Sequence, residues 1–191
     1  FYRGLMTYPA PGTRLAGAAF LTEARDLIAA SGLETKVVST GGSPEMWSDD
    51  GLAIATEYRA GTYVYFDRSL VKARASTWDD CALSVLATVV SVPTPERALL
   101  DAGSKALTMD LLGLNGYGVV HAMNDAPLYA LNEEHGYLDI SGVPDKPRIG
   151  DLVRVTPNHV CPVTNLYDRV VFVRGGEVLG AVPVDARGAV T

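Results

Sequence analysis

The sequence has few cysteines and histidines, and it lacks long apolar runs. Its 191 residues contain two cysteines, Cys81 and Cys161, so one disulfide at most can form and a secreted, disulfide-based scaffold is excluded. No apolar run approaches the roughly 18 residues that a membrane helix requires. No signal peptide is visible at the start. We therefore expect a cytoplasmic protein that neither spans nor binds a membrane.

Basic residues are also scarce. The chain has 16 Lys and Arg against 22 Asp and Glu, which gives a net charge of −6 without any basic cluster. Nucleic acid and anionic membranes are therefore excluded as expected partners. An initiator Met is missing too: the chain begins with Phe1, which already lies inside a strand-like stretch. We expect that the chain is part of a longer protein.

The apolar residues, 48% of the chain, are sufficient for a core in one large domain or two small ones. Residues 1–8 are typical of a strand, residues 13–31 of a helix and residues 36–40 of a short buried strand. Such a βαβ unit predicts two parallel strands. The expected apolar face of the helix consists of Leu21, Ala24, Leu27 and Ile28.

A glycine-rich loop, Gly41-Gly42-Ser43-Pro44, follows the second strand. Two glycines allow the backbone to approach a ligand closely and to turn its N–H groups toward it. Pro44 suits the first turn of a helix, with Ser43 as its N-cap. The loop is thus a candidate phosphate site. The alternative is a tight turn that only caps a helix.

After about residue 55 the pattern changes to short apolar stretches separated by turn residues. We expect residues 1–55 to form an α/β segment and residues 56–191 to form a mostly antiparallel β-domain. A glycine pair in residues 174–177 predicts a hairpin. The expected strands of this domain are residues 62–66, 84–90, 119–123, 128–131, 151–155, 170–173 and 178–184, and residues 99–104 are expected to form a further strand and turn.

His159 and Cys161 form the clearest candidate site, within residues 156–165. On an extended strand, side chains two residues apart point to the same face. An imidazole beside a thiolate makes half of a soft-metal site, for which zinc is the default ion. Water, substrate or another segment would complete the coordination. The alternative is a plain strand with a buried cysteine and a hydrogen-bonded histidine.

Six segments in this order resemble the D-threonine aldolase and D-serine dehydratase-like enzymes, which have the alanine-racemase-like fold. The resemblance extends over nearly the whole chain. The segments are Gly4–Tyr8, Ser39–Pro44, Glu57–Tyr63, Asp101–Lys105, Asn132–Gly136 and Pro157–Pro162.

The resemblance implies a fold and two cofactors. Residues 1–55 would be the last strands of a (β/α)8 barrel, followed by the β-domain. His159 and Cys161 would hold a divalent metal, with zinc favoured and manganese as the alternative. The residues expected to hold pyridoxal phosphate are Gly41, Gly42, Ser43, Tyr8 and Tyr63.

The lysine that binds the cofactor covalently in the family lies on the first barrel strand, which has no counterpart here. Lys105 is therefore not expected to replace it. Because the chemistry of the cofactor requires that lysine, we expect this chain to be inactive alone.

The resemblance further implies a homodimeric enzyme that acts on D-amino acids with a β-hydroxyl group. Such an enzyme would be either a dehydratase that releases ammonia or an aldolase that releases glycine. Cys161 is a softer ligand than Asp and favours zinc. By the resemblance, a zinc site slightly favours the dehydratase. Two alternatives stay open: an amino acid racemase without a metal, and a non-catalytic β-domain that binds a metal or a partner.

Overall fold

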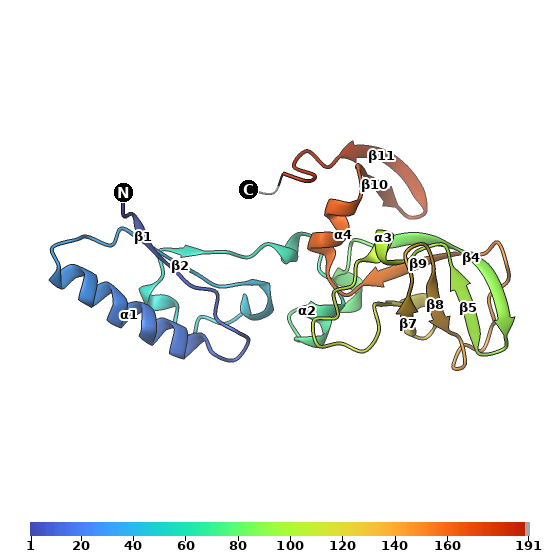
Figure 1. Cartoon of the computed structure of the whole chain (residues 1–191), viewed down its shortest axis with the longest axis horizontal. Helices are drawn as coiled ribbons and strands as arrows, with labels where there is room; N and C mark the ends of the chain where they lie inside the picture. Colours follow the sequence, from blue (N-terminus) through green and yellow to red (C-terminus); the bar gives the residue numbers. More distant parts are fainter. Residues whose placement is uncertain (190–191) are drawn as a thin grey trace. The chain divides into compact units, whose positions relative to one another are not determined.

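The computed structural model describes residues 1–189, which form two compact units (Figure 1). Unit 1 comprises Phe1–Val64 and Lys72–Ser76. Unit 2 comprises Tyr65–Val71 and the chain from Thr77 to the end of the described residues. The boundary expected after residue 55 falls within unit 1.

Unit 1 is built on a small parallel sheet. Its three strands, in the order β1-β2-β3, are β1 (Gly4–Met6), β2 (Val37–Thr40) and β3 (Glu57–Tyr58). β1 pairs with β2 in parallel, as the βαβ pattern predicted. β3 continues the parallel sheet beside β2. The connections contain three short 3₁₀ helices: η1 (Ser43–Glu45), η2 (Leu52–Ile54) and η3 (Thr62–Val64).

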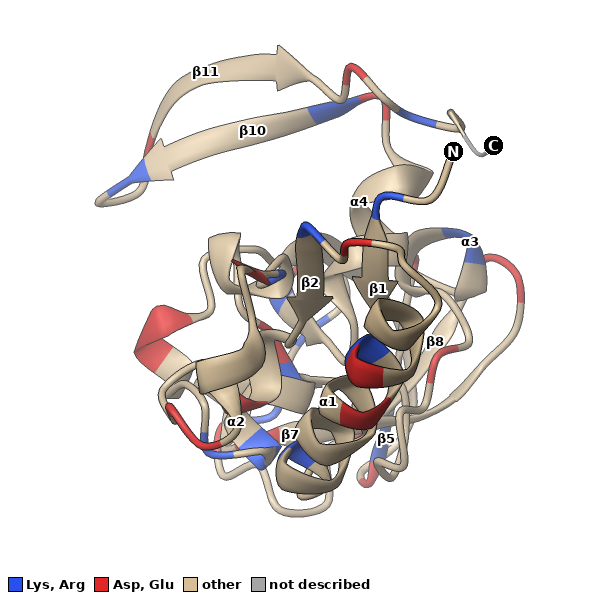
Figure 2. Cartoon of the chain, turned by 90° about the vertical axis from the view of Figure 1, so that its left-hand side faces the viewer, with Lys and Arg blue, Asp and Glu red and all other residues tan. Residues whose placement is uncertain are grey.

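Helix α1 (Arg14–Ala30) connects β1 to β2, which confirms the helix predicted from the sequence. Leu21 is buried, whereas Leu27 is 67% exposed, so the expected apolar face is only partly covered. Figure 2 shows acidic and basic residues interspersed along α1, without a patch of one sign on this helix. Gly32 follows the helix with φ of +83°, a conformation that favours glycine at a helix end.

Unit 2 contains a closed barrel of six strands, and every neighbouring pair is antiparallel. This confirms the predicted antiparallel β-domain. In barrel order the strands are β4 (Val85–Thr94), β5 (Arg97–Leu100), β8 (Gly136–Asp139), β7 (Ala126–Leu131), β6 (Gly118–Val120) and β9 (Leu152–Pro157).

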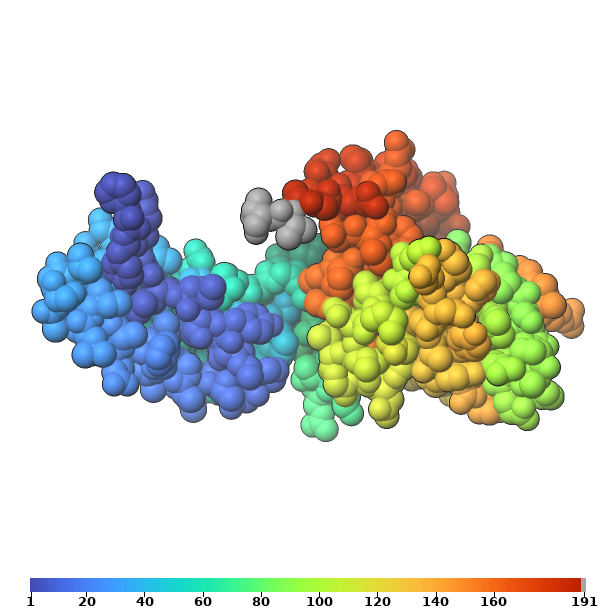
Figure 3. Space-filling view, in the orientation of Figure 1, coloured from blue at the N-terminus to red at the C-terminus, as the bar shows by residue number. Residues whose placement is uncertain are grey.

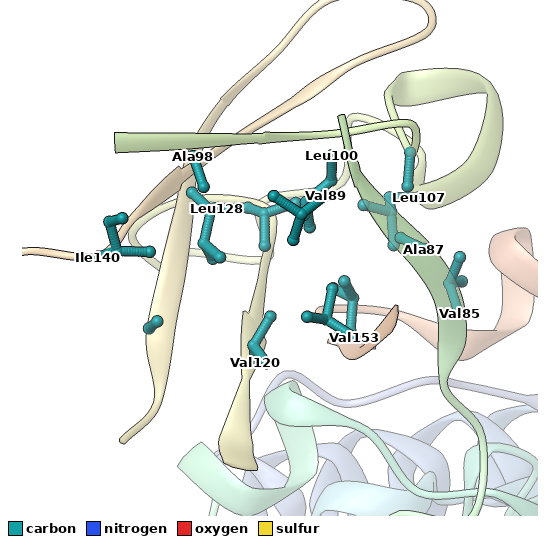
Figure 4. Packing of buried hydrophobic residues seen from close by; sticks show 14 of the residues in the cluster. Val85, Ala87, Val89, Ala98, Leu100, Leu107, Val120, Leu128, Ile140 and Val153 are labelled. Atoms are coloured by element: carbon teal, nitrogen blue, oxygen red, sulfur yellow. The ribbon is translucent and has the colours of Figure 1, made fainter. Parts of the chain in front are cut away.

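The barrel interior holds the hydrophobic core of unit 2 (Figure 4). Along β4, Val85, Ala87 and Val89 point inward and are buried, whereas Leu86 between them is 57% exposed. This alternation follows from the two-residue period of a strand. Other strands of the barrel contribute further fully buried side chains, among them Leu100, Leu128 and Leu138.

A separate hairpin follows the barrel, formed by β10 (Arg169–Arg174) and β11 (Glu177–Pro183). The turn residues Gly175 and Gly176 have φ of +56° and +86°, which confirms the predicted glycine hairpin. Several of its apolar side chains are exposed. The hairpin lies at the surface of unit 2, where it is drawn in red (Figure 3). Charged residues occur mainly near the strand ends (Figure 2).

The remaining elements of unit 2 are short helices, and two of the strand predictions for residues 56–191 fail in whole or in part. Of the strand predicted at residues 119–123, residues 121–123 form a 3₁₀ helix. The helices are α2 (Arg68–Lys72), η4 (Trp78–Asp80), α3 (Ser104–Leu107), η5 (His121–Met123) and α4 (Val160–Leu166). The strand predicted at residues 62–66 is instead the turn η3 of unit 1, because the N–H groups of Gly61 and Tyr63 bind the Ser43 hydroxyl rather than a neighbouring strand. Throughout residues 1–189, no helix has both the length and the apolar composition that crossing a membrane requires.

Candidate functional site

His159 lies at the point where a strand changes into a helix. β9 ends at Pro157 and α4 begins at Val160, so the strand expected to run through Cys161 is wrong. His159 itself has an extended backbone, with φ of −142° and ψ of 106°. The side chains of His159 and Cys161 still meet in a hydrogen bond. The turn into the helix thus brings together the two side chains that strand alternation was expected to align.

The surroundings of His159 favour its protonated form in the absence of a metal. The pKa of His159 is raised to about 9, chiefly by the hydrogen bond with Cys161. Burial opposes this shift, and a hydrogen bond with Asp110 supports it. The Asp110 Oδ2 atom lies 2.8 Å from His159 Nδ1. The pair thus carries the ligand types of a metal site and a carboxylate that orients one of them.

This arrangement fits a divalent metal. Asp110 binds Nδ1 of His159, which leaves Nε2 as the ring nitrogen for an ion, and metal-binding histidines commonly have such a carboxylate partner. Cys161 is exposed and can supply a thiolate. In the described part of the chain, no group of three or more His, Cys, Asp and Glu side chains is arranged to hold a metal. An ion held by His159 and Cys161 alone would keep coordination positions for water or substrate.

Asp110 was not predicted from the sequence. It lies 49 residues before His159, in a loop that has no metal-ligand spacing. Only the folding of the barrel brings this loop to the start of α4. The other cysteine of the chain has a different environment: burial raises the pKa of the Cys81 thiol to about 11, so Cys81 stays protonated at neutral pH.

The candidate phosphate loop lies in unit 1, at the carboxyl end of β2. Gly41 has φ of +95°, and a Cβ atom there would lie 2.2 Å from the Tyr58 ring. A Cβ atom on Gly42 would lie 2.7 Å from the Tyr8 ring. Both glycines are thus required for close packing of tyrosine rings. The Tyr8 ring thus lies against the loop.

Ser43 does not act as the N-cap that the sequence predicted. It is the first residue of η1, and the N-cap is Gly42, without a side-chain cap. The Ser43 hydroxyl is buried and accepts hydrogen bonds from the N–H groups of Gly61 and Tyr63, both at 3.2 Å. Ser43 therefore holds the segment of Tyr63 against the loop.

An unpaired cationic donor lies beside the same loop. Arg14 is buried, and its Nη1 donates to the carbonyl oxygens of Glu45 and Ser48. Its Nη2 is buried without a hydrogen-bond partner among residues 1–189. Arg14 lines a small cavity together with Gly41 and Gly42. The cavity has a volume of about 10 Å³, room for roughly one water molecule. The charge of Arg14 fits an anion such as a phosphate group, but a phosphate group is larger than this cavity, so its binding would require side chains that line the cavity to move.

Lys105 forms ion pairs at the surface of unit 2. Its Nζ lies 3.1 Å from Glu133 and 2.6 Å from Glu134, and hydrogen bonds with these exposed carboxylates raise its pKa. A lysine that binds a cofactor covalently must react as the neutral amine. The ion pairs with Glu133 and Glu134 favour the protonated form of Lys105 at the surface.

The chain is similar to proteins of one enzyme family. Residues 82–173 match the family described as "Putative serine dehydratase domain". D-threonine aldolase of Arthrobacter sp. is 33% identical over 167 residues, which are 85% of this chain and 42% of that protein. The chain belongs to the D-threonine aldolase and D-serine dehydratase-like family.

Solved structures of this family have the same fold. D-threonine aldolase from Filomicrobium marinum superimposes with a TM-score of 0.81 at 27% identity, over 100% of this chain and 55% of that one. D-threo-3-hydroxyaspartate dehydratase from Delftia sp. HT23 superimposes with a TM-score of 0.77 at 28% identity, over 95% and 55%. The chain therefore spans about half the length of these three relatives, and corresponds to their C-terminal portion.

Proposed function

We propose that this chain is the metal-binding C-terminal part of a pyridoxal phosphate-dependent lyase that acts on D-amino acids with a β-hydroxyl group. Two family members are named as an aldolase of D-threonine and a dehydratase of D-threo-3-hydroxyaspartate. Both substrates carry a hydroxyl group on Cβ. In the proposal, unit 1 is the last part of a (β/α)8 barrel and unit 2 is the β-domain of the same enzyme.

The observation that carries this proposal is the contact of Asp110, His159 and Cys161. His159 Nε2 and the Cys161 thiolate would hold the metal, and Asp110 would fix the orientation of the imidazole. When bound, the metal supplies a Lewis acid for the substrate hydroxyl. Zinc is favoured because a thiolate is a soft ligand, and manganese is the alternative.

The loop of unit 1 would bind the phosphate group of the cofactor. Gly41 and Gly42 present the backbone, and Arg14 presents a buried Nη2 without a partner among the described residues. Tyr8 would close one side of the pocket, and Tyr63 is held against the loop by Ser43. When bound, pyridoxal phosphate supplies an electron sink for the substrate.

A metal titration tests the proposal. The chain is freed of metal with a chelator and titrated with Co²⁺, which gives a thiolate charge-transfer band, and then with Zn²⁺ in competition. We expect Cys161→Ser to remove the band. His159→Ala should lower the Zn²⁺ affinity by more than the roughly 10–100-fold that loss of a supporting residue costs.

His121→Ala is the matched control. His121 is an exposed histidine whose Nδ1 lies 2.5 Å from a carboxylate, that of Asp125, but no cysteine follows two residues later. The His121→Ala variant should therefore have the same Zn²⁺ affinity as the wild-type chain. Equal losses in His121→Ala and His159→Ala, or no loss in either, would refute the metal role and favour a metal-free racemase.

To determine the reaction type, the protein encoded by the complete reading frame of the gene must be assayed. An aldolase releases glycine and an aldehyde from D-threonine, whereas a dehydratase releases a keto acid and ammonia from D-serine. Zn²⁺ binding without turnover of either substrate by the longer protein would favour the non-catalytic metal-binding domain instead.

A further inference from the structure

Asp67 is a fully buried carboxylate that holds two helices of unit 2 at once. Its Oδ1 accepts hydrogen bonds from the Leu70 N–H at 3.1 Å and from the Ser69 hydroxyl at 2.6 Å, at the start of α2. Its Oδ2 accepts a hydrogen bond from the N–H of Val160 at 3.0 Å, at the start of α4. A buried carboxylate requires such partners, because an unpaired charge in the interior is strongly unfavourable. Asp67 thus connects two segments that are 93 residues apart.

The residues on both sides of His159 are held by the same segment. Val160, which separates His159 from Cys161, is bound by Asp67. Asn158 precedes His159 and is 1% exposed. The Ser69 N–H donates to the carbonyl oxygen of Asn158 at 3.3 Å. Residues 67–69 therefore hold the backbone immediately before and after the histidine.

The side chain of Asn158 extends this network to the partner of the histidine. Its Oδ1 accepts a hydrogen bond from Arg68 Nη1 at 3.0 Å. Its Nδ2 donates to the carbonyl oxygens of Asp110 at 3.0 Å and Gly116 at 2.8 Å. The loop that carries the Asp110 carboxylate is thus fastened to the residue that precedes His159. One buried network supports the imidazole, its carboxylate partner and the start of α4.

We propose that Asp67 is a positioning residue for the ligand pair of His159 and Cys161. The relative direction of these side chains depends on where the extended backbone of His159 changes to the helical backbone of Val160. Asp67 binds the N–H group at that change, so it sets the separation and angle of the two ligands. This inference rests on the proposed metal role of the pair. Residues that orient metal ligands typically account for 10–100-fold in metal affinity.

The test compares Zn²⁺ affinity and the Co²⁺ absorption spectrum of the chain with those of Asp67→Asn. The amide keeps the shape of the carboxylate but replaces one acceptor oxygen by a donor, so it cannot satisfy both helices. We expect a loss of about 10–100-fold in Zn²⁺ affinity and a shifted or weakened thiolate-to-Co²⁺ band. Cys161 is retained in this variant, so a substitution that only lowered the stability of the fold would leave the thiolate-to-Co²⁺ band unchanged.

Two variants serve as controls. Asp80→Asn removes a carboxylate that caps η4 through the N–H and hydroxyl groups of Thr77, both at 2.8 Å, and should leave Zn²⁺ affinity unchanged. Leu138→Ala empties a fully buried position of the barrel and lowers stability without touching the network. It should lower the melting temperature but not the Zn²⁺ affinity. A loss of affinity in Leu138→Ala equal to that in Asp67→Asn would overturn a specific positioning role.

If Asp67→Asn loses its cooperative unfolding transition, Arg68→Met takes its place. This change removes the donor to Asn158 Oδ1 and leaves Asp67 intact, and we expect a loss of about tenfold. Wild-type affinity and spectrum in a folded Asp67→Asn, or in Arg68→Met where it replaces it, would overturn the inference. The failure of the proposed function differs: the wild-type chain would then bind no Zn²⁺ that depends on His159, and both the metal role and the positioning role would be refuted.

Discussion

Replacement of Gly41 by alanine tests why the loop after β2 contains two glycines. Gly41 has φ of +95°, and an added Cβ would lie 2.2 Å from the Tyr58 ring. That ring is held in place, because its hydroxyl donates to the Gly42 carbonyl oxygen at 2.8 Å and the Arg14 guanidinium lies 5.6 Å from its centroid. Alanine must therefore displace an anchored side chain.

The expected loss follows from three contributions. A non-glycine residue with positive φ costs about 1–2 kcal/mol. Overpacking against a side chain costs about 1–3 kcal/mol. Loss of the Tyr58 hydrogen bond costs about 0.5–1.5 kcal/mol. The three costs do not add in full, because movement of the Tyr58 ring relieves part of the steric overlap. We therefore expect Gly41→Ala to lower the free energy of unfolding of unit 1 by about 3 kcal/mol.

Urea unfolding followed by circular dichroism at 222 nm measures this loss, because the 17-residue α1 is in unit 1 and the helices of unit 2 have at most 7 residues. Gly12→Ala has positive φ of +80° but open space, so it should cost only about 1–2 kcal/mol. Gly61→Ala has open space and no positive φ and should be near neutral. A Gly41→Ala protein as stable as Gly61→Ala would refute the packing argument and leave ligand approach as the reason for the glycine.

Two further predictions concern titration and activity. Burial, followed by the charges of Asp67 and Asp80, raises the pKa of Cys81 from 9.0 to about 11. Because the folded state favours the protonated thiol, its stabilising effect is complete below about pH 9 and is lost as the pH rises toward 11. Urea midpoints between pH 7 and pH 11 should fall less steeply in Cys81→Ala, and equal slopes would contradict this prediction. The isolated chain should show no turnover of D-serine or D-threonine with added pyridoxal phosphate and Zn²⁺, because Lys105 is held in ion pairs with Glu133 and Glu134. A cofactor absorbance band together with turnover would contradict this second prediction.

Local patterns were sufficient for much of the fold. The periodicity of residues 13–31 predicted α1, because a helix repeats its apolar face within a few residues. The glycine pair at 175–176 predicted the β10–β11 hairpin, since a two-residue turn of this kind requires positive φ. The short strand β8 was missed because its four residues contain too little alternation.

Other local predictions failed where tertiary contacts replaced the local rule. Ser43 has the residue type of an N-cap, yet its hydroxyl binds the N–H groups of Gly61 and Tyr63. Residues 62–66 have the composition of a strand, yet residues 62–64 form the turn η3. In both cases hydrogen bonds between segments about 20 residues apart determine the outcome, and no short window of sequence contains them.

The sequence by itself determined the chemical types at the candidate metal site. His159 and Cys161 are two residues apart, so almost any ordered backbone keeps them near each other, and a metal site was predicted although the predicted strand was wrong. Tertiary structure alone decided which groups support them. Asp110 and Asp67 lie 49 and 93 residues before the groups they bind, and only closure of the barrel brings their carboxylates within hydrogen-bonding distance of the turn from β9 into α4. Asn158 is adjacent to His159, but its side chain binds the Asp110 carbonyl oxygen, 48 residues earlier in the chain.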